Sequence, residues 1–218
     1  MNDREHLAPT IAAYERDALA YADKPDDRAW LIPLVERFAS LLEAGALVLD
    51  LGCASGRETV ELRAAGLRVL GLDMTAAFLR IAIERHPAEG YVRGDFLHLP
   101  LVGGSLDGVW ASASLLHLTP GEVDGALAEV RRVLRHGGVF YSSMQIGHSA
   151  GMVPSTQHES VSGPRYYTFW QPQDWCSRLE AAGFEVIALD AADLGQAAEF
   201  HCNQGGSGWL TALVRGET

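Results

Sequence analysis

Cysteine is scarce in this sequence, and long apolar runs are missing. Among 218 residues there are three cysteines, Cys53, Cys176 and Cys202, and no two of them have CxxC spacing. An odd count without a signal peptide is typical of a reducing compartment, so we expect a cytoplasmic protein that needs no disulfide. Because the N-terminus is polar and no run of 18 apolar residues occurs, we expect no membrane segment.

Basic residues are also few. Lys and Arg total 17 against 28 Asp and Glu, which gives a formal net charge of −11. Binding to a nucleic-acid backbone rests largely on Lys and Arg that displace counterions, so the composition argues against a nucleic-acid partner. The basic cluster Arg131, Arg132, Arg135 and His136 falls at a predicted helix C-terminus, where positive charge complements the helix dipole.

The rest of the composition is that of an ordinary globular protein. Hydrophobic residues make up 48% and charged residues 21% of the chain. A chain of this size buries roughly 70% of the surface that its unfolded form exposes, enough for one large core. His148, His158 and His201 lack the spacing of metal ligands, so no metal site is expected.

A glycine turn follows the first apolar strand pattern. The apolar segment 46–51 runs into Gly52 and Gly56 and then into a helix-forming sequence, the order typical of strand, tight turn and helix. Glycine lets the backbone approach a ligand closely, and a helix start presents unpaired N–H groups. Alone, the turn is compatible with a nucleotide-like or amino-acid-bearing cofactor, or with glycines needed only for geometry.

Strand and helix patterns alternate along the chain. A helix with a narrow apolar stripe is predicted at 7–22, and a stronger one from a cap at Asp26 or Asp27 to Gly45. The alternation predicts an α/β fold with a doubly wound, largely parallel sheet and helices on both faces. The expected strands are 46–51, 67–72, 90–93, 106–113, 139–144, 184–189 and 208–214, and the other expected helices are 58–65, 75–85 (capped by Thr75), 120–135 (with a capping box from Thr119 to Glu122) and 171–183.

Acidic and apolar residues follow the second and third strands. Ligands of doubly wound sheets bind beyond the carboxyl ends of the strands, so these residues are expected to meet. Asp73 is suited to accept both hydroxyls of a ribose. Asp95 is suited to pair an exocyclic amino group, while Phe96 and Met74 offer apolar walls for a base.

Together these residues resemble the class I S-adenosylmethionine-dependent methyltransferases over nearly the whole chain. The glycine turn is similar to that family's first motif, 69–74 to its second, 92–100 to its third and 106–118 to its fourth. The segment 134–138 resembles the helix end before the fifth strand. The resemblance implies a seven-stranded, Rossmann-like sheet of order 3-2-1-4-5-7-6 with the last strand antiparallel.

The resemblance also implies a site for S-adenosylmethionine. The glycine turn would contact the methionine part, with Asp50 behind it near the amino group and Ser112 following the fourth strand. Asp73 would hold the ribose and Asp95 the adenine amino group. Many members of the family carry glycine where this chain has Ala54. The residues placed at the cofactor are Asp50, Gly52, Cys53, Ala54, Gly56, Asp73, Met74, Asp95, Phe96 and Ser112.

Methyl transfer to a small-molecule acceptor is the chemistry that the resemblance implies. A base is needed only if the acceptor must lose a proton, and His117 is the candidate, unless it is a structural histidine. Tyr14 and Tyr21 are candidate acceptor contacts from the first helix. Tyr166 is suited to wall an aromatic acceptor and Arg165 to bind a carboxylate, although a strand packed on the core explains their alternation equally well.

We therefore expect a single methyltransferase domain over residues 1–218. Residues 1–44 are expected to form an N-terminal helical lid and 45–144 the cofactor-binding core. A substrate-covering loop is expected at 145–170, and 171–218 supplies a C-terminal helix and strands.

Three alternatives remain open at this point. One is a non-methylating alkylation or ring closure that uses the same cofactor. A second is a nicotinamide-dependent oxidoreductase, although the third glycine of G-x-G-x-x-G is misplaced and Gly94-Asp95 has no role there. The last is a protein that binds the cofactor without turnover. The sequence predicts neither the acceptor nor the oligomeric state.

Overall fold

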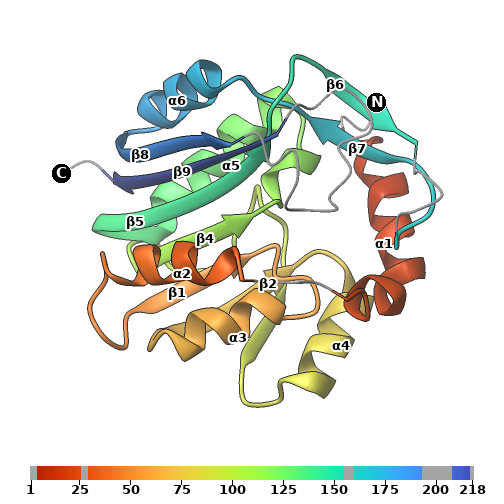
Figure 1. The fold of residues 1–218 in the computed structure, drawn as a ribbon, viewed down its shortest axis with the longest axis horizontal. Coiled ribbons are helices and arrows are strands. Elements are labelled where there is room, and N and C mark those ends of the chain that lie inside the picture. The colour runs from red at the N-terminus through yellow and green to blue at the C-terminus, as the bar shows by residue number, and fades with distance from the viewer. Residues whose placement is uncertain (1–3, 26–28, 155–159, 193–207, 217–218) are drawn as a thin grey trace.

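The computed structural model describes residues 4–25, 29–154, 160–192 and 208–216. A central sheet lies between helices that cover both of its faces (Figure 1). In these described ranges, no helix combines the length and apolar character needed to cross a bilayer. The predicted cap at Asp26 or Asp27, and also His158, His201 and Cys202, lie outside the described residues.

The sheet has seven strands in the order β3-β2-β1-β4-β5-β9-β8. β9 is antiparallel to its neighbours β5 and β8, and the other pairs are parallel. Counted along the chain within this sheet, the order is 3-2-1-4-5-7-6, so the predicted topology and its antiparallel last strand are confirmed. The strands are β1 (Leu47–Leu51), β2 (Arg68–Asp73), β3 (Gly90–Arg93), β4 (Leu106–Ser112), β5 (Leu134–Gln145), β8 (Phe184–Ala192) and β9 (Trp209–Gly216).

Successive side chains of the central strands supply two separate cores. Leu49 joins a buried cluster with residues of α5 and α6, whereas its neighbour Val48 packs in a cluster with α2 and α3. The alternation follows from the two-residue period of a strand, so each face of the sheet needs its own helical cover. The helices are α1 (Leu7–Ala22), α2 (Leu31–Ala39), α3 (Arg57–Ala64), α4 (Ala76–Arg85), α5 (Pro120–Val133) and α6 (Pro172–Ala181), with a short 3-10 helix, η1, at Leu115–His117.

The starts of two helices test the predicted caps. At α5, the Thr119 hydroxyl accepts from the Glu122 N–H at 3.3 Å and Glu122 accepts from the Thr119 N–H at 2.8 Å, so the capping box is confirmed. At α4, Thr75 occupies the cap position, but its side chain makes no capping bond. The predicted cap position and helix end are confirmed, but the capping bonds come from α1: the Glu15 carboxylate accepts from the N–H groups of Ala76 and Ala77, at 2.6 and 3.0 Å.

Two further elements differ from expectation. α2 ends at Ala39 instead of continuing to Gly45, and the residues that follow form turns. Leu41 and Leu42, which gave the sequence its longer helical pattern, pack on the core from these turns. Between β5 and α6, a two-stranded sheet replaces part of the predicted loop: β6 (Ala150–Val153) pairs antiparallel with β7 (Arg165–Thr168). Short strands depend on their partner rather than on their own pattern, so the sequence did not reveal β6.

Candidate active site

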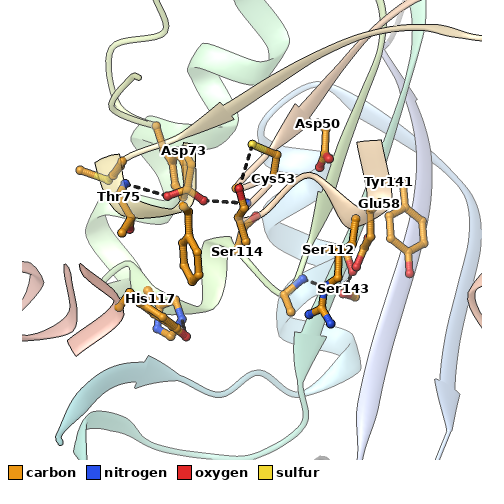
Figure 2. Close-up of a pocket in the computed structure, with 18 of the residues that line it drawn as sticks. Asp50, Cys53, Glu58, Asp73, Thr75, Ser112, Ser114, His117, Tyr141 and Ser143 are labelled. Atoms are coloured by element: carbon orange, nitrogen blue, oxygen red, sulfur yellow. Dashed lines mark hydrogen bonds between the residues drawn. The ribbon is translucent and has the colours of Figure 1, made fainter. Parts of the chain in front are cut away.

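A cavity of about 420 Å³ opens beyond the carboxyl ends of β1, β2, β4 and β5. α1 closes one side of it and α2 another. Figure 2 shows Asp73 and Thr75 at one end of the view, Glu58 and Tyr141 at the other, and His117 below. The predicted site residues that line the cavity are Tyr14, Tyr21, Asp50, Gly52, Cys53, Ala54, Asp73, Met74, Phe96, Ser112 and His117.

Both glycines of the turn are sterically required. Gly52 has φ +84°, and a Cβ there would lie 2.3 Å from Ser114 Cβ. Gly56 has φ +79°, and a Cβ there would lie 2.4 Å from Tyr91 Oη. Gly56 is the N-cap residue of α3 and does not itself line the cavity. Any side chain at either position would displace its neighbours, so the turn can lie this close to the cavity only with glycine.

Asp73 ties the glycine turn to the end of β2. One carboxylate oxygen accepts from the Ala54 N–H at 3.0 Å and the other from the Thr75 N–H at 2.7 Å. Burial raises the pKa of Asp73, and these backbone hydrogen bonds oppose the rise only in part. Each oxygen of a carboxylate has two acceptor sites, so Asp73 can still accept hydroxyl groups from a ligand.

Asp50 and Cys53 line the cavity from the first strand and the turn. Asp50 is buried, and its Oδ2 accepts from the Thr59 hydroxyl at 2.6 Å, which holds the carboxylate against α3. Burial raises the pKa of the Cys53 thiol well above its ordinary value, and the charges of Asp50 and Asp73 add to the effect. The thiol is therefore protonated and not a nucleophile at neutral pH.

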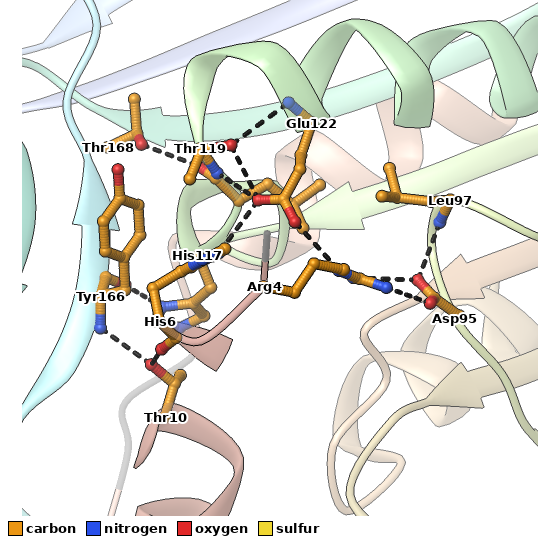
Figure 3. Close-up of polar contacts among 11 residues, drawn as sticks. Arg4, His6, Thr10, Asp95, Leu97, His117, Thr119, Glu122, Tyr166 and Thr168 are labelled. Atoms are coloured by element: carbon orange, nitrogen blue, oxygen red, sulfur yellow. Dashed lines mark hydrogen bonds and ion pairs between the residues drawn. The ribbon is translucent and has the colours of Figure 1, made fainter. Parts of the chain in front are cut away.

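Asp95 lies beside the cavity rather than in its lining. Its carboxylate accepts from the Leu97 N–H at 3.0 Å. It also accepts from both terminal nitrogens of Arg4, with Nη2 3.1 Å from Oδ1 (Figure 3). Arg4 Nε also donates to Glu122 at 2.9 Å. Burial opposes ionisation of Asp95, but the hydrogen bonds from Arg4 and Leu97 outweigh it and lower its pKa. No sequence pattern predicted that an N-terminal arginine reaches this carboxylate.

The acceptor candidates form one cluster where α1, η1 and β7 meet. His117 lies between Tyr14, on α1, and the backbone of Tyr166, on β7. Arg165 is buried next to Tyr14. Tyr14, Tyr21 and His117 line the cavity, whereas Arg165 and Tyr166 lie behind that lining. The structure thus brings these five residues together but does not expose all of them to a ligand.

Ala113, Ser114 and Ser143 also line the cavity and were not among the predicted site residues. Ala54 and Ala113 have φ of +46° and +50°, the two non-glycine residues with positive φ in the described ranges, and both face the cavity. The Ala113 N–H donates to Ser143 Oγ at 2.8 Å. Ser114 Oγ is buried without a hydrogen-bond partner in the described part of the chain. Ser143 could have been predicted, because it lies near the end of the fifth predicted strand, where ligands of doubly wound sheets bind.

The far end of the cavity is polar. Glu58 Oε2 accepts from Trp110 Nε1 at 2.7 Å, and Tyr141 stacks on Trp110 with ring centres 3.7 Å apart. Burial raises the pKa of Tyr141, and the charge of Glu58 adds to the rise. Arg57 also lines the cavity, with Cζ 5.2 Å from the centre of the Tyr21 ring. None of these residues was singled out in the sequence. In the described ranges, no group of His, Cys, Asp or Glu is arranged to hold a metal ion.

Comparison with known proteins identifies the central segment. Residues 49–142 match the family model described as "Methyltransferase domain". An uncharacterized methyltransferase of Synechocystis sp. is 34% identical over 128 residues, which cover 51% of this chain and 60% of that protein. A malonyl-[acyl-carrier protein] O-methyltransferase of Pectobacterium atrosepticum is 36% identical over 107 residues, 48% of this chain and 42% of that protein.

The chain therefore spans less than two thirds of the length of these curated relatives. Among solved structures, a SAM-dependent methyltransferase of Methanosarcina mazei superposes with a TM-score of 0.71 at 17% identity, over 85% of this chain and 97% of that one. The matched segment contains the glycine turn, Asp73 and Asp95, and the sheet has the order implied by the family resemblance. Residues 49–142 thus match a methyltransferase domain, and the chain has the fold of a solved SAM-dependent methyltransferase.

Proposed function

We propose that this protein transfers a methyl group from S-adenosylmethionine to a small-molecule acceptor. The observation that carries the proposal is that one cavity gathers the glycine turn, Asp50 and Asp73 on one side and Tyr14 and His117 on another. The turn offers a close backbone approach, and the buried Ser114 hydroxyl, which has no hydrogen-bond partner among the described residues, lines the same cavity. These are features that a polar nucleoside cofactor needs.

On this proposal, the cofactor residues act by holding the cofactor in place. Asp73 accepts the ribose hydroxyls, and Met74 and Phe96 pack on the adenine. Asp95 lies beside the cavity with Arg4 on its carboxylate, so a bond from the adenine amino group to Asp95 would need that contact to open. Gly52, Cys53 and Ala54 border the methionine part, with Gly56 holding the turn at the start of α3, Asp50 near the amino group and Ser112 on the opposite strand end. This set is the one expected from the sequence, and its roles stay predictions.

S-adenosylmethionine, when bound, supplies a methyl group on a positively charged sulfur. The protein's task is to place the acceptor in line with that methyl group and to keep water away, because the charge on sulfur disappears during transfer. Tyr14, Tyr21, Arg165 and Tyr166 are proposed acceptor-side residues, and His117 the proton acceptor. α1 and the segment with β6 and β7 would then form the cover over the acceptor.

The mixed charge of the cavity and the net charge of −11 support a small-molecule acceptor over a nucleic acid. We also keep the cytoplasmic location as a prediction, because it rests on the cysteine pattern of the sequence alone.

Calorimetry with S-adenosylmethionine tests the proposal. Asp73→Ala should weaken binding by roughly 100-fold, because a charged acceptor for two hydroxyls is lost. The matched control is Asp107→Ala, since Asp107 is a partly buried carboxylate that also accepts a backbone N–H, from Leu47 at 2.6 Å, but does not line the cavity. Both variants should lose stability, and only Asp73→Ala should lose affinity. If the wild-type protein does not bind S-adenosylmethionine at millimolar concentration, the proposal is wrong.

Product analysis separates the alternatives within the cofactor class. S-adenosylhomocysteine is expected, whereas methylthioadenosine would point to ring closure. A shift in nicotinamide fluorescence on mixing would support an oxidoreductase instead. Tight cofactor binding together with no methylation across a broad panel of acceptors would favour a binding protein.

A further inference from the structure

His117 is held at the side of the cavity by one hydrogen bond on each ring nitrogen. Nδ1 lies 2.6 Å from the backbone oxygen of Tyr166, and Nε2 lies 3.0 Å from Tyr14 Oη. Figure 3 shows the His117 ring next to Tyr166, which is itself anchored to Thr10 of α1. The orientation of this ring is therefore fixed by η1, β7 and α1 together.

These contacts determine where the protons are. A backbone carbonyl only accepts hydrogen bonds, so Nδ1 of His117 carries the ring proton and donates it to Tyr166. Burial lowers the pKa of His117 to about 4; the bond to Tyr166 opposes this and the charge of Arg165 adds to it, so the ring is neutral at pH 7. Nε2 is then a lone-pair acceptor, and the Tyr14 hydroxyl must be the donor in the contact between them.

Tyr14 consequently presents an acceptor, not a donor, to the cavity. Its only hydroxyl proton is engaged by His117, and one lone pair of Oη accepts from Arg165 Nη1 at 3.5 Å, so one lone pair is left for a group that enters. A ligand atom bonded to Tyr14 must therefore carry a hydrogen of its own.

The Arg165 cation determines which ligand charge is favoured next to Tyr14 Oη. It is buried, with Nη1 3.5 Å from Tyr14 Oη and Cζ 5.7 Å from the centre of the Tyr14 ring. A cation this close stabilises negative charge that develops on or next to the Tyr14 oxygen and opposes a second cation there. A neutral donor that becomes an anion is favoured, and an ammonium group is not.

The walls at this point are aromatic. The ring of Tyr14 is 5.9 Å from that of Tyr21 and 5.6 Å from that of Phe78, centre to centre, and all three side chains line the cavity. Such walls suit a flat, apolar ligand.

We infer that the acceptor is a neutral aromatic or enolic hydroxyl compound, methylated on oxygen, and that Tyr14 relays its proton to His117. The inference rests on the proposed function and adds to it the substrate class and the path of the proton. Tyr14 is then the catalytic residue that touches the acceptor. His117 is the terminal proton acceptor, and Arg165 is a positioning residue.

The step is balanced as follows. The O–H bond of the acceptor breaks and its proton bonds to Tyr14 Oη, while the Tyr14 O–H bond breaks and that proton bonds to His117 Nε2. The acceptor oxygen forms the new bond to the methyl carbon, and the electron pair of the carbon–sulfur bond stays on sulfur. One positive charge disappears at sulfur and one appears on His117, so the net charge of the site does not change.

Other acceptor classes fit these contacts less well. A carboxylate brings only acceptor atoms and would face the acceptor oxygen of Tyr14. It would also need no base. A protonated amine would have to enter beside the buried Arg165 cation. Proton transfer through Tyr14 to His117 is needed only when the acceptor is neutral as it binds and must lose a proton to be methylated.

Four aromatic probes test the substrate class: phenol, benzoate and benzylamine, which are of similar size, and the larger 2-naphthol, each incubated with the full chain and S-adenosylmethionine. We expect O-methyl ethers from phenol and 2-naphthol, and calorimetric binding of both phenols to the protein loaded with S-adenosylhomocysteine. Preferred methylation of benzoate or benzylamine overturns the inference, and so does the absence of phenol binding. If S-adenosylmethionine itself fails to bind, the proposed function has failed instead.

His117→Gln and His117→Asn test the relay. Asn keeps a donor for the Tyr166 carbonyl but removes the acceptor for Tyr14, and Gln offers an acceptor near the Nε2 position. His117→Asn should lower kcat by roughly 100-fold with little change in KM, with Gln partly restoring it. The matched control is His136→Asn, at an exposed position near the start of β5, which should leave kcat unchanged.

The pH dependence distinguishes a relay from a structural histidine. With the relay intact, the rate for phenol should be flat from pH 6 to 8, because His117 is already unprotonated there. In His117→Asn the rate should instead rise about tenfold per pH unit towards the pKa of phenol, about 10 as in tyrosine, because only free phenolate reacts. The described ionisable groups that face His117 are Tyr14 from α1 and Arg165 and Tyr167 from β7. Equal slopes for the two proteins overturn the relay.

Discussion

At the scale of single residues, strain gathers at the cavity. Ala54 and Ala113 both adopt left-handed backbone conformations, which cost a residue with a Cβ about 1–2 kcal/mol. Ala54 is also the position where many members of the family that the sequence resembles carry glycine, so this difference in sequence corresponds to a strained residue in the structure. The strain is offset by the hydrogen bond from the Ala54 N–H to Asp73.

Ala54→Gly should therefore raise the free energy of unfolding by about 0.5 kcal/mol, because relief of the left-handed strain exceeds the extra entropy of glycine in the unfolded chain. Chemical denaturation measures the change. Ala128→Gly, at an exposed site inside α5, is the matched control and should lose about 1 kcal/mol. Equal destabilisation by the two substitutions would contradict a strained Ala54.

At the scale of elements, α1 is fastened to the start of α4. The Glu15 carboxylate accepts from two free N–H groups of α4, and Arg85 of α4 donates to the carbonyl of Ala22 at 3.3 Å. α1 thus completes a helix that its own sequence caps poorly, and the same packing brings Tyr14 and Tyr21 to the cavity wall.

Glu15→Ala should lower stability by about 1–2 kcal/mol, the cost of losing a charged cap at a helix N-terminus. It should also weaken binding of S-adenosylmethionine, because the wall formed by α1 loosens. Denaturation and calorimetry measure the two effects. Glu84→Ala, an exposed carboxylate at the other end of α4, should change neither; if it matches Glu15→Ala, net charge rather than capping is responsible.

The sequence predicted the elements whose signals are local. α1 and β3 have the predicted bounds, and the capping box of α5 is present, because periodicity and caps depend on neighbours along the chain. β6 and the cap supplied by Glu15 were not predictable in this way, because their partners are distant in sequence. The same holds for the site. Asp73 was found from its place after a strand, whereas the contact of Arg4 with Asp95 joins two segments that no pattern connects.

At the scale of the whole molecule, the buried neutral His117 links stability to pH. Its pKa is about 4 in the folded protein, against an ordinary value near 6.5. Below pH 6.5 the His117 ring is protonated in the unfolded chain but stays neutral in the folded protein. The contribution of His117 to the free energy of unfolding is therefore fully present above pH 6.5 and is lost as the pH falls towards 4.

Between pH 7.5 and 5.0, His117 should account for a loss of about 2 kcal/mol in the free energy of unfolding. Denaturation curves of the wild type and His117→Gln at both pH values check this, because the variant should lose about that much less. His98→Gln, at an exposed position, should behave like the wild type. Identical pH dependence in wild type and His117→Gln would mean that the ring is not held neutral.

The place of β9 in the sheet has a consequence for how the protein is made. β9 comes after β8 in the sequence but lies between β5 and β8. Until β9 has left the ribosome, β8 has no neighbour and β5 keeps a bare edge that carries Phe140 and Met144. Open edges of this kind pair readily with other chains. The nascent chain is therefore most exposed to aggregation just before its sheet is complete, and a chaperone would be needed most during that interval.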